Sequence, residues 1–210
     1  LPLVSPVQLR EAFKFLFASR FTVFLLAASL ANASHGMLYT EGAVYWEQLG
    51  FSTFAIGLLW SSAVLAEATL FFCSVYILNR VPLAQLLCIG LFGTTLRWLA
   101  MSYATGFWPI LMLQLLHCIS FALTYLALMH FIRLNVPQNL RNTAQGVYTA
   151  FASGLLLSGA QWFSGPLFEW AGGKAFLAMA AIAGVGLAVA VFNLVKLSPT
   201  RQVAVASSSH

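Results

Sequence analysis

The sequence predicts an all-α membrane protein with six transmembrane helices. Hydrophobic residues make up 60% of the chain and charged residues 7%, whereas soluble domains carry about 25% charged residues. The apolar residues fall in continuous runs of about 20 residues, the length that a helix needs to cross a bilayer. Because the runs do not alternate between apolar and polar residues, they argue against a membrane β-barrel.

Six apolar runs can be delimited, and each one predicts a helix. In chain order the predicted spans are residues 21–42, 55–78, 83–104, 107–131, 144–168 and 175–196. Each is longer than a helix that is merely buried in a soluble core. In the fifth span, small residues recur every four positions at Gly146, Ala150, Gly154 and Ser158. This stripe predicts close packing against another helix.

Charged residues between the runs indicate how the helices are oriented. Eight Lys and Arg residues fall on one side of the predicted membrane: Arg10, Lys14, Arg20, Arg80, Arg133, Arg141, Lys196 and Arg201. Lys174 falls on the other side, together with Glu41, Glu47 and Glu169. Since Lys and Arg mark the cytoplasmic side, both termini are expected in the cytoplasm. The net charge of +5 is therefore interpreted as a topology signal, and no nucleic-acid partner is expected.

The two ends of the chain complete the predicted organisation. Residues 1–20 are expected to form a cytoplasmic linker and interfacial segment, and residues 21–196 the six-helix bundle. Residues 197–210 are small and polar, and they are expected to be a disordered cytoplasmic tail. The chain starts without Met and without a signal-peptide layout. We therefore expect it to be part of a longer protein.

The few polar side chains inside the spans are the candidate functional residues, because such groups are costly in lipid and face a cavity or a partner. Glu67 is expected near the middle of the second span, Arg97 in the outer half of the third, and His117 near the middle of the fourth. The other candidates are Asn32, His35 and Tyr39 in the first span and Gln114 in the fourth. Their helical spacing predicts polar stripes that face a shared wet cavity.

Structural roles are open alternatives for some of these residues. Glu67 and Arg97 could form an ion pair that only holds two helices together, and His117 could be a neutral hydrogen-bond partner between helices. His35 is balanced between packing and a place in the cavity. The three cysteines show no metal-ligand spacing, so neither a metal nor another cofactor is expected.

Several classes of enzyme are disfavoured. The chain contains no Asp, which excludes paired-Asp proteolysis and Asp-rich metal sites. It has neither an H-E-x-x-H nor a G-x-S-x-G motif. A transporter is therefore favoured over an enzyme, and a channel or a membrane subunit without transport activity is the weaker alternative.

In the third and fourth spans, Arg97 is followed twenty residues later by an LH pair that ends in His117. An intramembrane Arg and an LH pair at this spacing resemble the lactose permease branch of the major facilitator superfamily. Further segments read YWEQLGFSTFAIGLLWSSAVLAEATLFF, LHCISFALTYLALMHFI and AQGVYTAFASG, and they resemble the related phenylpropionate permease family of that superfamily. Together these segments cover about residues 30–190.

The resemblance implies the C-terminal six-helix half of a twelve-helix carrier, with a related N-terminal half as its missing partner and a substrate site between the two. It implies proton-coupled uptake of a small organic solute, such as an aromatic carboxylic acid, across the cytoplasmic membrane of a bacterium. A nucleoside or a sugar is the alternative solute. Together with the polar stripes, this predicts that the substrate-binding residues are Arg97, His117, Asn32, His35, Gln114 and Tyr39, and that the proton-coupling residues are Glu67 and His117.

One position departs from the lactose permease pattern. Ser120 stands where that branch has a Glu one turn after the His. Carboxylate chemistry is therefore expected of Glu67.

Overall fold

The computed structural model describes residues 19–196, so most of the predicted linker and all of the predicted tail lie outside the described residues. The α-helices are α2 (Ser19–Ala33), α3 (Gly36–Gln48), α4 (Thr53–Phe72), α5 (Ser74–Leu78), α6 (Leu83–Met101), α7 (Phe107–Leu115), α8 (Thr124–Asn135), α9 (Arg141–Thr149), α10 (Ser158–Ala171) and α11 (Phe176–Lys196). Two π-helical segments, η1 (Cys118–Leu123) and η3 (Ala150–Leu157), join α7 to α8 and α9 to α10. Two 3-10 turns, η2 (Gln138–Leu140) and η4 (Gly172–Ala175), precede α9 and α11.

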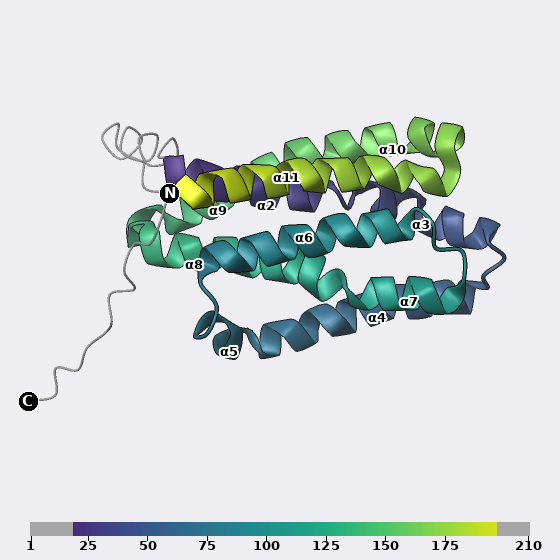
Figure 1. The fold of residues 1–210 in the computed structure, drawn as a ribbon, viewed down its shortest axis with the longest axis horizontal. Helices are drawn as coiled ribbons and strands as arrows, with labels where there is room; N and C mark the ends of the chain where they lie inside the picture. The colour runs from purple at the N-terminus through teal and green to yellow at the C-terminus, as the bar shows by residue number, and fades with distance from the viewer. Residues whose placement is uncertain (1–18, 197–210) are drawn as a thin grey trace, which may run out of the picture.

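These elements form the six predicted crossings, and the all-α membrane fold is confirmed. Five helical stretches are long and apolar enough to span a bilayer. The last, residues 138–192, has 55 residues and would extend about 80 Å as one helix, far more than a bilayer needs. It is two crossings, because the chain reverses at Gly172, whose φ of +54° favours glycine. Figure 1 shows the chain turning back there from α10 into α11; α11 then packs against α6 and α2, whereas α10 packs against α3.

The helices lie along the long axis of the molecule in two groups. Figure 1 shows α2, α9, α10 and α11 on one side and α4, α6, α7 and α8 on the other, and α6 packs against α11. The apolar core is divided into two clusters. One contains Phe21, Leu87 and Phe131, and the other contains Trp46 and Phe176, among other residues. The buried polar side chains described below come from the parts of the helices between these clusters.

The first span was predicted as one continuous helix over residues 21–42, but the structure divides it into two helices. Helix α2 ends at Ala33 and α3 begins at Gly36 and continues to Gln48. At the break, Ser34 Oγ donates to the carbonyl oxygen of Ala31 at 2.6 Å. A side chain on Gly36 would meet Ala160 of α10 at 2.8 Å, so the break lies where two helices are almost in backbone contact.

The small-residue stripe of the fifth span does not pack against another helix among the described residues. Gly146, Ala150, Gly154 and Ser158 are all exposed, and a side chain on Gly146 would meet nothing within 4 Å. Close approach occurs instead at glycines outside the stripe. A side chain on Gly90 would meet Thr124 at 2.5 Å. The four-residue period places small residues on one face, but it does not say which way that face points.

Candidate functional site

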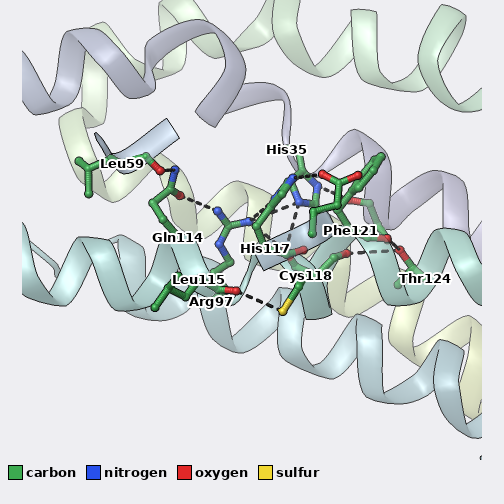
Figure 2. Close-up of polar contacts among 12 residues, drawn as sticks. His35, Leu59, Arg97, Gln114, Leu115, His117, Cys118, Phe121 and Thr124 are labelled. Atoms are coloured by element: carbon green, nitrogen blue, oxygen red, sulfur yellow. Dashed lines mark hydrogen bonds and ion pairs between the residues drawn. The ribbon is translucent and has the colours of Figure 1, made fainter. Parts of the chain in front are cut away.

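Arg97 of α6 is the centre of a buried cluster of polar side chains, and it is 0% exposed. Its Nε donates to the carbonyl oxygen of Leu113 at 2.7 Å, and its Nη2 donates to Oε1 of Gln114 at 2.6 Å. Its Nη1 lies 2.9 Å from Oγ of Ser120 and 3.1 Å from Nδ1 of His117. Figure 2 shows the guanidinium between Gln114 and His117. One charged side chain therefore binds α6 to both α7 and η1.

His117 connects Arg97 to Glu67. Because a guanidinium can only donate hydrogen bonds, Nδ1 of His117 is the acceptor of its contact with Arg97, and the ring proton lies on Nε2. This Nε2 lies 3.5 Å from Oε2 of Glu67 on α4. The Glu67 side chain is 24% exposed. The three groups therefore lead from a buried cation to a carboxylate at the edge of the bundle.

This arrangement bears on the suggested ion pair between Glu67 and Arg97. In the described conformation Glu67 contacts His117 rather than Arg97. The side-chain and backbone acceptors around the guanidinium are neutral groups. A buried cation without a carboxylate in contact is costly, so the site favours an anionic partner.

His35 lies at the break between α2 and α3, with its ring in the same cluster and 0% exposed. Its Nδ1 donates to the carbonyl oxygen of Ala31 at 2.9 Å, because a carbonyl can only accept. Its Nε2 is then an acceptor, and it lies 3.3 Å from Oγ of Ser120 and 3.4 Å from Nη1 of Arg97. The partners of His35 thus select one tautomer of its ring.

The other predicted site residues divide into two groups. Gln114 belongs to the cluster, and its Nε2 also donates to the carbonyl oxygen of Leu59 on α4 at 3.3 Å. Tyr39 lies beside the cluster, with its ring centroid 5.7 Å from that of His35. Asn32 instead contacts Ser153 of η3 at 3.4 Å through its Nδ2. Asn32 therefore connects two helices outside the Arg97 contacts.

Two residues of the cluster were not among the predicted site residues. Ser120 was noted only as a departure from a pattern, although its position three residues after His117 could have placed it on the same helix face. Trp98 is 0% exposed, and its Nε1 donates to Oγ of Ser34 at 2.9 Å. Because neighbours on a helix point about 100° apart, the sequence left open whether Trp98 faces the cavity or lipid; its ring centroid lies 4.4 Å from Cζ of Arg97.

The described residues contain no group of three or more His, Cys, Asp or Glu side chains that could hold a metal ion. The cluster brings together a buried guanidinium, two imidazoles, an amide and a carboxylate.

Six apolar crossings around a buried charged cluster are typical of membrane transport proteins. The model of the MFS_1 like family matches residues 5–178, and the chain belongs to this family of the major facilitator superfamily. Over 160 residues the chain is 31% identical to the probable 3-phenylpropionic acid transporter of Escherichia coli strain K12. The aligned region covers 76% of the chain and 42% of that relative, so the chain spans less than half the length of this relative.

Proposed function

We propose that the chain is one half of a secondary transporter that takes up a small aromatic carboxylic acid together with a proton across the inner membrane of a bacterium. The observation that carries this proposal is the path from Arg97 through His117 to Glu67. It combines a buried cation suited to an anionic solute with a carboxylate that can bind a proton. The similarity to the probable 3-phenylpropionic acid transporter of Escherichia coli supports an aromatic acid as the solute.

The hydrogen-bond roles in the cluster support Glu67 as the group that binds the proton. His117 accepts from Arg97 through Nδ1 and presents its proton on Nε2 to Glu67. It has no free acceptor for another proton while both contacts persist. An ionised Glu67 would repel the carboxylate of the solute. Protonation of Glu67 removes this repulsion, so proton binding and acid binding favour one another.

For Arg97 to bind the solute, its guanidinium must exchange one of its present hydrogen-bond partners for the solute carboxylate. The guanidinium is 0% exposed, and its shortest contact is with Gln114 at 2.6 Å. A solute carboxylate that displaced the Gln114 amide would gain a charge-assisted pair of hydrogen bonds, which the planar guanidinium favours. Gln114, His35 and His117 are then the polar side chains beside the bound anion.

The proposal includes a second six-helix unit, and it states which ends of the helices face the cytoplasm. Carriers with related halves bind their solute between them, and the exposed face of α9 and η3 is a surface that such a unit could cover. Arg20, Arg80, Arg133 and Arg141 lie at ends of α2, α5, α8 and α9. By the positive-inside rule these helix ends are cytoplasmic.

Transport measured in proteoliposomes tests this function. The intact carrier should take up labelled 3-phenylpropionate in a saturable manner when a pH gradient is imposed, and an uncoupler should abolish accumulation. Residues 1–210 alone should show no saturable uptake, because half of the site wall is absent. Competition by nucleosides or sugars but not by aromatic acids would instead identify the alternative solute class, and a linear, non-saturating flux would indicate a channel.

A further inference from the structure

Three partly exposed aromatic rings lie beside the buried polar cluster. The ring of His35 lies 5.7 Å from that of Tyr39 and 6.0 Å from that of Phe121. The ring of Trp60 lies 6.2 Å from that of Tyr39. Tyr39 is 37% exposed, and Trp60 and Phe121 are half-buried. Helices α3 and α4 and segment η1 thus supply three aromatic rings, namely Tyr39, Trp60 and Phe121, which we call the aromatic wall.

Phe121 connects this aromatic wall to His117, the residue that contacts both Arg97 and Glu67. Its ring lies parallel to that of His117, with the centroids 5.4 Å apart and an angle of 4° between the planes. Figure 2 shows the two rings next to one another. Nε2 of the same imidazole contacts Glu67. Since Nδ1 of this imidazole lies 3.1 Å from Nη1 of Arg97, a molecule whose ring lay against Phe121 could reach the guanidinium with a short side chain.

We infer that Tyr39 and Phe121 bind the aryl ring of the transported acid and determine the selectivity for aromatic over aliphatic acids. This inference rests on the proposed function. Aromatic rings attract one another at centroid distances of 4.5–7 Å, beyond the effect of the apolar area they bury. A saturated ring of similar size buries a similar area but has no π face. The aromatic wall therefore discriminates between the two rings, while the polar cluster binds the carboxyl group of both.

The charges around the aromatic wall favour an acid over an amine as the aromatic solute. Aromatic rings beside a carboxylate can also bind a cation. Here, however, the guanidinium of Arg97 lies 3.1 Å from the imidazole that contacts Glu67. A cationic solute at this point would meet a permanent charge of the same sign, whereas protonation of Glu67 leaves a net positive site for an anion.

The inference is tested by competition in proteoliposomes that contain the intact carrier, with labelled 3-phenylpropionate and two unlabelled competitors. The competitors are 3-phenylpropionate and 3-cyclohexylpropionate. The wild type should prefer the phenyl acid by about two- to tenfold, the range that one aromatic contact supplies. Phe121→Leu and Tyr39→Leu should each bring this ratio toward one, with the affinity for the cyclohexyl acid nearly unchanged. Tyr39→Phe should retain the wild-type ratio.

Phe92→Leu is the matched control, because Phe92 lies on α6 and is 59% exposed; it should leave the ratio unchanged. If Phe121→Leu fails to insert, the more exposed Tyr39 still tests the aromatic wall. The inference is overturned if both leucine variants keep the wild-type ratio, or if the wild type takes up the acids without a preference. Uptake of phenethylamine in preference to both acids would also overturn it. Wild-type carrier that transports neither acid would overturn the proposed function itself.

Discussion

Arg97 and Glu67 are joined through the imidazole of His117. Nδ1 of this ring lies 3.1 Å from Nη1 of Arg97, and its Nε2 lies 3.5 Å from Oε2 of Glu67. The ring accepts on one side and donates on the other. Protonation of Glu67 therefore changes the charge on a group that is connected to the buried guanidinium through a single imidazole ring.

Glu67→Gln in the intact carrier should abolish accumulation of the aromatic acid but leave exchange across the membrane. Glutamine can still accept from His117, but it cannot bind a proton. Accumulation driven by a pH gradient and exchange of labelled for unlabelled solute would be measured in the same vesicles. Glu169→Gln, at an exposed position of α10, is the control. Wild-type accumulation by Glu67→Gln would show that another group carries the proton.

Gln114→Glu should weaken binding of the acid by about tenfold or more, which corresponds to about 1.4 kcal/mol. The substitution places a carboxylate where Oε1 of Gln114 now lies, 2.6 Å from Nη2 of Arg97. The guanidinium would then be neutralised by the protein itself. Gln114→Met removes the same contacts without adding charge, and equilibrium binding to the intact carrier compares the two. Equal losses in both variants would mean that the charge of Arg97 does not attract the solute.

Trp98→Phe and Ser34→Ala should each lower the free energy of unfolding. The double variant should lower it by less than the sum of the two single losses. The indole N–H of Trp98 donates to Oγ of Ser34 at 2.9 Å, and the phenyl ring of the variant can still stack on Phe176, 5.7 Å away. Hydrogen bonds between membrane helices contribute about 0.6 kcal/mol on average and about 1.7 kcal/mol at most. Unfolding in a detergent series gives the coupling energy. A coupling energy of zero would refute a stabilising contact.

Gly36→Ala should destabilise the protein by about 1–3 kcal/mol, the usual cost of overpacking. Its new Cβ would meet the Cβ of Ala160 at 2.8 Å and two backbone atoms of the same helix at 3.0 Å. Gly57→Ala is the control, because a side chain there meets nothing within 4 Å. That variant should be neutral or more stable, since Ala favours helix over Gly by about 0.5–1 kcal/mol. Equal thermal stability of the two variants would contradict the close contact of α3 with α10.

The sequence by itself determined the class of fold and most members of the buried polar cluster. Continuous apolar runs can satisfy their backbone hydrogen bonds in a membrane only as helices, so the number of crossings followed from counting runs. The rarity of charge in those runs singled out Glu67, Arg97 and His117. This worked because burying an ionisable group in lipid is costly, and few such residues occur without a partner or a cavity.

The tertiary structure decided how these residues meet. Helical spacing gives the face that a residue occupies, but not the rotation of that face toward a neighbouring helix. The spacing therefore could not predict that the small-residue stripe faces outward and that Trp98 faces inward. The π-helical turn of η1 between His117 and Thr124 changes the register of faces along the fourth span. Only the packed helices could therefore place His117 between Arg97 and Glu67, with Phe121 against it.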